Sequence, residues 1–360
     1  GLSSRLASQF SRSRPVTAMV ERTDLELSSE REQVSGPAEV VSVEPTAQAR
    51  AEFQAALDAL DANGGDDVNA MLALRDLMRR FPGLADQIPS LVRANRLADR
   101  AIAVLLHATE LAGNPRAQTA LVTVAEDQMV THRHRLRAIV ALGGVEAPTE
   151  LATDWLQRQS ATLAATEEQL DRVHTALLSL GRCGAAMKEA SPERYRSEVQ
   201  SILAQRLARS PRPEHAAIAL KAIGNTADAG LASTVVDHLR SNSAAERSAA
   251  AEALGSMNAV GARDNLLGHL NTEGNGRVRQ FVVGALANVA PKEPEILRTL
   301  DARIERESNG EARMAMARYL VDGLDTRPES RASLERLLQT ETEPQIVRYV
   351  AGRLYRRARE

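Results

Sequence analysis

Aromatic side chains are scarce in this sequence: Phe, Trp and Tyr together make up 2% of its 360 residues. The cores of β-sandwiches and barrels draw on aromatic and β-branched residues, so this scarcity argues against an all-β fold. Ala and Leu supply much of the apolar surface instead, and they are the strongest helix formers among apolar residues. Because small side chains let helix axes approach to roughly 8 Å, the composition favours a stack of packed helices.

Three other scarcities exclude whole classes of protein. A single cysteine, Cys183, excludes an internal disulfide framework. No apolar run approaches the roughly 20 residues that a membrane-spanning helix needs, so no membrane span is predicted. The formal net charge of -2 argues against a general nucleic-acid binder, which needs a basic face to displace counterions.

Motifs for catalysis and metal binding are also missing. No Gly-rich phosphate loop follows a strand, and no Ser nucleophile elbow is present. The acidic stretch from Asp61 resembles a calcium loop, but Gly65 and Asp66 stand in the wrong order and Leu72 replaces the final oxygen ligand. We therefore predict that the chain is not an enzyme and has no cofactor and no metal.

The chain divides by composition into two parts. Residues 1–45 are rich in Ser and Arg and contain Gly36-Pro37, so they are predicted to form an extended or partly disordered N-terminal arm, with one short helix beginning at Ser29. From Thr46 onward the pattern is helix, short break, helix, with Gly and Pro at the breaks. Residues 46–360 are therefore predicted to form one domain of helical repeats.

The repeats align by eye in two helix types. The first has a capping residue, then Arg four positions on, then Leu seven further on, as in Ser243-Arg247-Leu254, Asn275-Arg279-Leu286, Asn309-Arg313-Leu320 and, earlier, Thr131-Arg135-Leu142. The second has two apolar residues, a gap of two, then Leu, as in Val235-Val236-Leu239, Leu266-Leu267-Leu270 and Ile296-Leu297-Leu300. A period of about 30 to 40 residues with two helices per period is typical of a helical solenoid.

The predicted fold is therefore all-α, a superhelical stack of antiparallel helical hairpins. One hairpin cannot bury its apolar face alone, and stacked neighbours make a continuous core. Four alanines lie four residues before the Leu or Ile that marks a repeat, and we expect them where neighbouring helices touch: Ala138, Ala176, Ala219 and Ala250.

Two of the first-type helices resemble a known family. The segments 247–255 and 278–286 look like the second helix of HEAT repeats. This resemblance implies a HEAT-like α-solenoid whose second helices line the concave face. Family members often carry Asp in the turn before the repeated Arg, and the two form a ladder. Ser, Thr or Asn stands at the helix start here, so no Asp–Arg ladder is expected.

A second resemblance is narrower. The order and rough spacing of Thr175–Gly181, Ala219–Asn225 and Ala249–Leu254 look like the helical domain of vitellogenin-type large lipid transfer proteins, over residues 68–260. In that family the helical domain braces a lipid cavity built mainly from β-sheets. No strand-rich region is predicted here, so a complete lipid carrier is excluded for this chain alone.

The repeated arginines are the first candidates for partner binding. Arg247, Arg279 and Arg313 occupy equivalent positions in three consecutive repeats and should form a row on the concave face. Two interpretations stay open. The arginines bind turn carbonyls and nearby glutamates within the fold, or they line a groove for an acidic peptide.

Arg133, Arg137 and Trp155 complete the candidate partner-binding residues. The first two lie in a basic helix start, Thr131–Arg137, with His132 and His134 between. Cationic groups at a helix N-terminus oppose the helix dipole, so a carboxylate partner is expected, inside the fold or outside it. Trp155 is either partly buried or an anchor for a partner, since Trp is over-represented in binding hot spots.

The function predicted first is a non-catalytic scaffold that binds a protein partner through its concave face or N-terminal arm. Other domains of a longer polypeptide count among such partners. The alternative is a helical brace in a larger lipid-transport protein, in which case lipid is also bound. The same architecture serves many roles, so the sequence fixes neither the partner nor the compartment.

Overall fold

The computed structural model describes residues 44–210 and 212–355, and every regular element in these ranges is helical. This confirms the predicted all-α, HEAT-like stack of hairpins. The helix expected at Ser29 and nearly all of the predicted arm lie in residues 1–43, outside the described residues. The described chain forms two units, one of residues 44–141 and 164–175, the other of residues 142–163 and 176–355.

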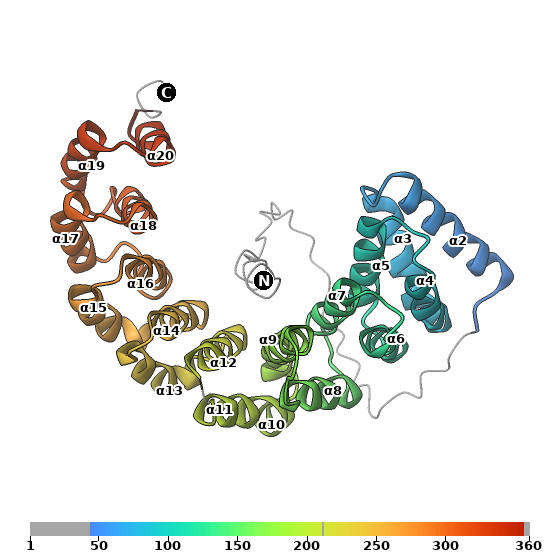
Figure 1. Ribbon diagram of the computed structural model, residues 1–360. Coiled ribbons are helices and arrows are strands. Elements are labelled where there is room, and N and C mark those ends of the chain that lie inside the picture. Colours follow the sequence, from blue (N-terminus) through green and yellow to red (C-terminus); the bar gives the residue numbers. More distant parts are fainter. Residues whose placement is uncertain (1–43, 211, 356–360) are drawn as a thin grey trace, which may run out of the picture. The chain divides into compact units, whose positions relative to one another are not determined.

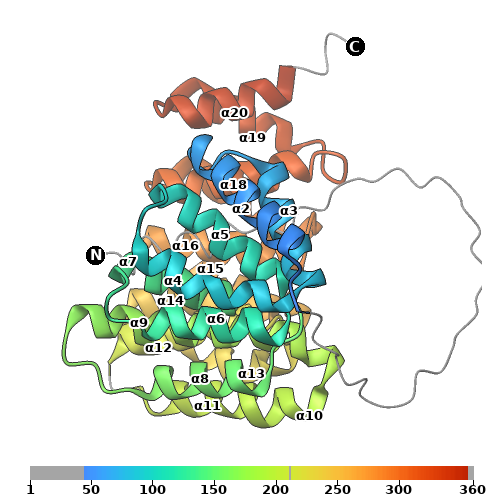
Figure 2. The ribbon, with the colours of Figure 1, turned by 90° about the vertical axis from the view of Figure 1, so that its right-hand side faces the viewer.

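Unit 1 packs two rows of helices against each other. Its helices face the viewer in Figure 2. Its elements are α2 (Ala47–Ala62), α3 (Val68–Arg80), the 3₁₀ turn Pro82–Gln87, α4 (Ile88–Ala94), α5 (Asp99–Ala112), α6 (Pro115–Glu126), α7 (His132–Leu142) and the first turns of α9 (Glu167–Ala190). Helix α2 begins one residue after Thr46, whose side chain caps it by accepting a hydrogen bond from the N–H of Ala49 at 3.0 Å.

Unit 2 continues the pattern of hairpins to the last described residue. Its elements are α8 (Glu150–Ala161), the rest of α9, α10 (Pro192–Arg194), the π-helical turn Tyr195–Gln200, α11 (Ser201–Ala208), α12 (Pro213–Asn225), α13 (Ala232–Val236), α14 (Ala244–Ser256), α15 (Arg263–Thr272), α16 (Gly276–Val289), α17 (Pro294–Arg303), α18 (Gly310–Asp322), α19 (Ser330–Thr340) and α20 (Pro344–Tyr355). Four short 3₁₀ turns adjoin α13, α15 and α17: Ala229–Leu231, Asp237–Arg240, Val260–Ala262 and Ile304–Arg306.

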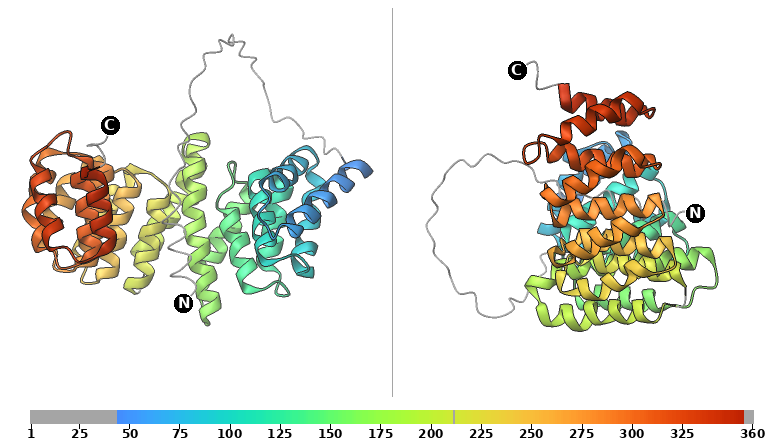
Figure 3. Two further views of the ribbon diagram at one scale, coloured as in Figure 1. Left: turned by 90° about the horizontal axis from the view of Figure 1, so that it is seen from above. Right: turned by 90° about the vertical axis from the view of Figure 1, so that its left-hand side faces the viewer.

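Two rows of helices build unit 2. Helices α12, α14, α16, α18 and α20 form the inner row, and α11, α13, α15, α17 and α19 form the outer row (Figure 1). The inner helices pack against one another in sequence order. Figure 3 shows the helices from two further directions. Three of the first-type helices of the sequence, α14, α16 and α18, thus lie in the inner row, as the HEAT resemblance implies. The apolar residues of the second type, such as Leu266 and Leu300, are buried between the rows.

Small residues bring the inner helices close together. A Cβ atom added at Gly224 of α12 would lie 2.8 Å from Ala253 Cα of α14, and one added at Gly255 of α14 would lie 2.8 Å from Ala285 Cα of α16. Real Cβ atoms do not come so near, so only glycine fits at these two positions. The four alanines predicted at helix contacts, Ala138, Ala176, Ala219 and Ala250, are each fully buried.

Candidate protein-interaction surface

The three repeated arginines of unit 2 form a ladder with glutamates of the following repeat. Arg279 in α16 donates from Nε and Nη2 to the two carboxylate oxygens of Glu307, at 2.6 and 2.5 Å. Its Nη1 donates to the carbonyl oxygen of Glu273, at 3.1 Å, in the turn before its own helix. Each of these arginines thereby bonds to two successive turns. Its contact with the glutamate is bidentate, which is the strongest geometry for an Arg–carboxylate hydrogen-bonded pair.

The same pattern repeats on either side. Arg247 in α14 donates to both carboxylate oxygens of Glu273, at 2.7 and 3.0 Å, and to the carbonyl oxygen of Ser241, at 2.9 Å. Arg313 in α18 donates to both carboxylate oxygens of Glu341, at 2.8 and 3.1 Å, and to the carbonyl oxygen of Glu307, at 2.9 Å. We call these three pairs the Arg–Glu ladder.

The ladder carboxylates are held in their charged form. Burial would raise the pKa of Glu307, but hydrogen bonds from Arg279 and from the backbone N–H of Asn309 outweigh it and hold the pKa below the ordinary value. The pKa of Glu273 is lowered in the same way, against burial, by Arg247 and the N–H of Asn275. The pKa of Glu341 is likewise lowered, against burial, by Arg313 and nearby backbone N–H groups.

The ladder uses glutamate where the HEAT family often has aspartate. No Asp–Arg ladder was expected because Ser or Asn begins these helices, but a glutamate two residues before the capping Asn takes the role of the Asp. In Glu273-x-Asn275 and Glu307-x-Asn309, the Asn caps the helix and its N–H donates to the Glu. The recurrence of Glu at this spacing was readable in the sequence. What the spacing could not show is that the Glu bonds to the Arg of the preceding repeat.

The ladder occupies the arginines that sequence analysis offered for partner binding. Arg279 keeps 9% of its side chain exposed and Glu307 keeps 1%, and Arg247 and Arg313 are also largely covered. Of the two interpretations left open for this row, the structure shows the internal hydrogen bonds to glutamates and turn carbonyls. A role for Arg247, Arg279 and Arg313 in binding a partner stays a prediction.

The basic helix start of unit 1 has an internal carboxylate partner. Asp99 at the beginning of α5 pairs with Arg133 at 3.0 Å, with His134 at 3.0 Å and with Arg137 at 3.1 Å. Hydrogen bonds from Arg137, and next from His134, lower the pKa of Asp99 although burial opposes them. Burial lowers the pKa of His134, which favours its neutral form. The carboxylate expected for this cluster is therefore supplied within the fold.

The three candidate residues outside the ladder differ in how far they are exposed. Arg133 projects most of its side chain into solvent, whereas Arg137 is mostly covered. Trp155 in α8 is 2% exposed and belongs to the core of unit 2. Partner binding by Arg133, Arg137 and Trp155 is not tested by these positions and stays a prediction.

Sequence reasoning missed an exposed pair on the inner row. The guanidinium carbon of Arg318 in α18 lies 5.8 Å from the ring centre of Tyr349 in α20, a cation–π distance. Arg318 is exposed and Tyr349 is half-buried. At the equivalent position of the preceding inner helix, α16, Gly284 faces open space, because a Cβ atom added there would meet nothing within 4 Å. This part of the inner row is therefore polar, accessible and supplied with an Arg–Tyr pair.

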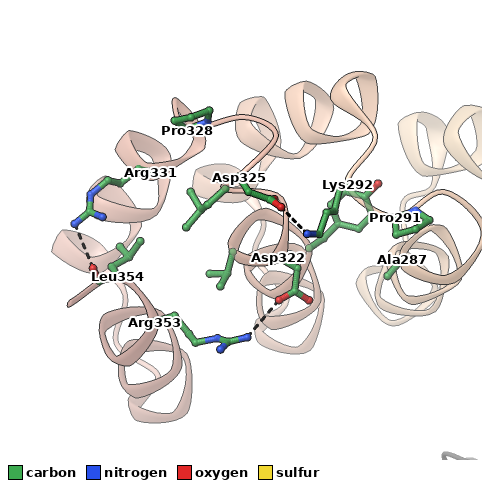
Figure 4. A pocket seen from close by; sticks show the side chains of 12 residues that line it. Ala287, Pro291, Lys292, Asp322, Asp325, Pro328, Arg331, Arg353 and Leu354 are labelled. Carbon is green, nitrogen blue, oxygen red and sulfur yellow. Dashed lines mark hydrogen bonds and ion pairs between the residues drawn. The ribbon is translucent and has the colours of Figure 1, made fainter. Parts of the chain in front are cut away.

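A groove adjoins the ends of α16, α18 and α20. Its volume is about 620 Å³, and Figure 4 shows the side chains that line it. Two ion pairs cross it, Lys292 with Asp325 at 2.7 Å and Arg353 with Asp322 at 3.5 Å. A second hollow of about 570 Å³ shares Pro291 and Lys292 with it and extends to Val260. We call the two together the rim groove.

Within residues 44–210 and 212–355, no group of three or more His, Cys, Asp or Glu side chains is placed to hold a metal ion. In the same ranges, no helix is long and apolar enough to cross a membrane.

Comparison with known families supports the HEAT-like assignment. Residues 201–287, which contain α11 to α15 and most of α16, match the family model for HEAT repeats. No curated protein matches the chain. The resemblance to the helical domain of vitellogenin-type proteins is not shown by these comparisons.

Solved structures of similar fold point the same way. The crystal structure of Kap121p matches 85% of this chain at 15% identity with a TM-score of 0.52, and a Kap121p mutant matches 83% at 14% with a TM-score of 0.50. In each case this chain spans 37% of the length of Kap121p. At such identities the likeness concerns the fold alone. Human deoxyhypusine hydroxylase matches 77% of this chain and 98% of its own length at 18% identity, but the TM-score of 0.30 supports no conclusion.

Proposed function

We propose that this HEAT-like solenoid is a protein-interaction scaffold that binds its partner along the inner row of unit 2, over α16, α18 and α20. The observation that carries the proposal is the exposed Arg318 of α18 within cation–π distance of Tyr349, together with the open space at Gly284, which holds the equivalent position of the preceding inner helix α16. Arg and Tyr are enriched among residues that dominate binding energy, and a helical glycine without a neighbour lets a partner's backbone approach closely.

The Arg–Glu ladder supports this role by holding the surface rigid. Each pair fixes the start of one inner helix against the turn of the next, so the exposed side chains keep their spacing when no partner is present. A surface that is ordered beforehand loses less conformational entropy on binding. The arginines of the ladder then serve as positioning residues, while the contacts themselves fall to the exposed side chains.

The rim groove extends the proposed surface. It lies at the ends of α16, α18 and α20, the same three helices that carry the proposed surface. Its lining combines apolar side chains, such as Pro328 and Leu354, with the charged pairs described above. Such a mixture suits an extended polypeptide segment, which needs shallow apolar contacts together with partners for its backbone.

Binding is favoured over catalysis and over lipid transport. The buried carboxylates with lowered pKa values in the ladder are each committed to an arginine. The large apolar side chains exposed in the described residues stand on separate elements: Val68, Met129, Leu151, Leu163, Val260 and Tyr355. A brace for a lipid cavity needs a continuous apolar patch of a few hundred Å², so the lipid-transport role ranks second.

Site-specific photo-crosslinking tests the proposal. A crosslinking amino acid replaces Arg318 on the inner row or, as the matched control, the exposed Arg298 on outer helix α17. In the source cells, we expect one protein adduct from position 318 that is absent from position 298. Adducts of equal yield from both positions, or none from position 318, would contradict an inner-row binding surface.

A further inference from the structure

Helix α18 packs against α16 in the same register in which α20 packs against α18. A Cβ atom added at Gly276, the first residue of α16, would collide with Asn309, the residue before α18. A Cβ atom added at Gly310, the first residue of α18, would collide with Glu343, the residue before α20. A contact between α18 and α20 therefore has an equivalent between α16 and α18.

This register places two small residues side by side on the inner row. The guanidinium carbon of Arg318, the ninth residue of α18, lies 5.8 Å from the ring centre of Tyr349, the sixth residue of α20. The residues at the equivalent positions are Gly284 of α16 and Ala315 of α18. Gly284 is exposed and has open space where a side chain would stand, and Ala315 is half-exposed. We call this pair the Gly–Ala site.

An aromatic ring borders the Gly–Ala site. Phe281 lies three residues before Gly284 on α16, and residues three apart are neighbours on one helix face. Its side chain is half-exposed, so part of it is open to solvent. A ring beside bare helix backbone offers an apolar contact surface that a compact ring of a partner can cover.

A cation without a carboxylate borders the site on the next helix. Arg318 lies one turn after Ala315, is exposed, and forms no ion pair with any carboxylate of the described residues 44–210 and 212–355. Asp322, one further turn along α18, pairs with Arg353 at 3.5 Å instead. Because only the ring of Tyr349 lies against the guanidinium group, the N–H donors of Arg318 are available to a carboxylate of a partner.

The spacing of these features matches one conformation of a bound peptide. Axes of packed helices lie roughly 8–10 Å apart, so equivalent features of successive inner helices recur at about that interval. A polyproline II helix has three residues per turn and rises about 3.1 Å per residue, so every third residue returns to one side after about 9 Å. A β-strand returns to one side after about 6.7 Å and falls out of step with the row.

We propose that α16, α18 and α20 bind a proline-rich segment of a partner protein in the polyproline II conformation. A proline ring sits at the Gly–Ala site, and an acidic residue three positions away pairs with Arg318. The inference rests on the inner-row function proposed above and names the ligand class of that surface.

Two properties of the surface select this ligand. Proline-rich segments dock on aromatic side chains, which Phe281 and Tyr349 supply, and their conformation exists before binding, so little entropy is lost. Arg318 favours an acidic residue, because a hydrogen bond between an arginine and a carboxylate is stronger than one between neutral groups.

The test uses the full chain and three labelled peptides of about 12 residues, which span about 37 Å in the polyproline II conformation. The Pro–Glu peptide is polyproline with one central Glu, and the Pro–Lys peptide has Lys at that place. The third peptide has the central Glu in a flexible host of Gly and Ser. Fluorescence anisotropy is expected to show binding of the Pro–Glu peptide and at least about tenfold weaker binding of the other two.

One substitution locates the proline contact. Gly284→Leu fills the Gly–Ala site and should weaken binding of the Pro–Glu peptide by about tenfold or more, the size of effect seen when a hot spot is removed. The matched control is Gly268→Leu on outer helix α15, which should leave binding unchanged. Both glycines are exposed and have open space beside them, so both variants gain the same side chain without a clash.

A second substitution locates the acidic contact. Arg318→Glu should reverse the charge preference, so that the Pro–Lys peptide binds more tightly than the Pro–Glu peptide. Arg298→Glu on outer helix α17 makes the same change at an exposed arginine and should leave the preference as it is. Circular dichroism melting curves confirm that each variant is folded.

Three outcomes would overturn the inference. Equal binding of the rigid and flexible Glu peptides removes the polyproline II conformation. Unchanged binding by folded Gly284→Leu, or an unchanged charge preference in Arg318→Glu, places the peptide elsewhere. A dimer in sedimentation velocity that Gly284→Leu abolishes would show that a second copy covers the row.

The inference and the inner-row function fail separately. A specific protein adduct from position 318, together with no binding of the Pro–Glu peptide, would leave the inner-row function standing and remove its proline-rich ligand. The inner-row function itself is contradicted by the crosslinking result, whichever peptide binds.

Discussion

At the scale of single residues, the ladder pair Arg279–Glu307 shows how a buried charge pair constrains the fold. Both side chains are almost fully covered. Arg279 donates three hydrogen bonds, and the acceptors are oxygen atoms of Glu273 and Glu307, which lie in the turns between helices. Removing one partner leaves a charge in a poorly solvated place, whereas removing both charges leaves two neutral groups that still fit together. The loss of one partner should therefore cost more than the loss of both charges.

Substitution of this pair tests that reasoning. Arg279→Gln should lower the free energy of unfolding by about 3 kcal/mol, because Glu307 is left buried without its cation. The double variant with Glu307→Gln should be less destabilised than the single variant. Urea denaturation followed by circular dichroism measures both. Arg318→Gln, an exposed arginine of the neighbouring helix, is the control and should change stability little.

At the scale of the helix, glycine has opposite effects at two sites of the inner row. Gly224 in α12 touches the backbone of α14, so its missing side chain allows the helices to approach. Gly284 in α16 has only open space beside it, so its missing side chain contributes nothing to packing. Glycine within a helix lowers stability relative to alanine through backbone entropy, and only the first site offsets that loss with closer contact.

The same substitution should therefore change stability in opposite directions at the two sites. Gly224→Ala should destabilise the protein by about 1–3 kcal/mol, the usual cost of overpacking, because the new Cβ meets backbone that cannot move aside. Gly284→Ala should stabilise it by about 0.5–1 kcal/mol. Thermal melting followed at 222 nm compares the two. Equal shifts of the same sign would show that the close helix contact at Gly224 is relaxed in solution.

At the scale of the whole molecule, stability in a helical stack comes from contacts between neighbouring repeats. The Arg–Glu ladder adds one polar contact to each of three consecutive interfaces in unit 2. Within each unit, the apolar core is shared between the two rows, so no hairpin is expected to fold well by itself. Acid should therefore weaken several interfaces of unit 2, since the pKa of each ladder glutamate is lowered from its ordinary value in the folded protein.

The pH dependence of unfolding follows from the three ladder glutamates. Their pKa values lie below the ordinary value of 4.5 in the folded protein. Folded groups with depressed pKa values stabilise the protein above the ordinary pKa, and this contribution is lost as the pH falls through the folded values. The free energy of unfolding should therefore decrease as the pH drops below about 4.5, as urea titrations at each pH would measure.

A ladder-free variant provides the comparison. It carries Gln at all three arginines and all three glutamates of the ladder, and its stability should depend less on pH in this range than that of the natural sequence. Parallel curves for the two proteins would mean that other carboxylates, and not the ladder, govern the loss of stability in acid.

Local features of the sequence were enough to predict the helices and their pairing into hairpins. Helix propensity, capping residues such as Asn275 and Asn309, and apolar residues at helical spacing act over a few neighbours, so a linear pattern records them directly. The spacing of Arg247, Arg279 and Arg313 likewise placed them at equivalent positions. The HEAT-like resemblance placed those helices in the inner row, where the structure also has them.

Contacts between repeats were decided only by the tertiary structure. The partner of Arg279 lies 28 residues away at Glu307, and any of several nearby carboxylates was compatible with the sequence. Burial of Trp155 and the open space at Gly284 likewise depend on which side chains pack beside each residue. Such neighbours come from distant parts of the chain, and their identity depends on the rise and rotation from one repeat to the next, which no local pattern encodes.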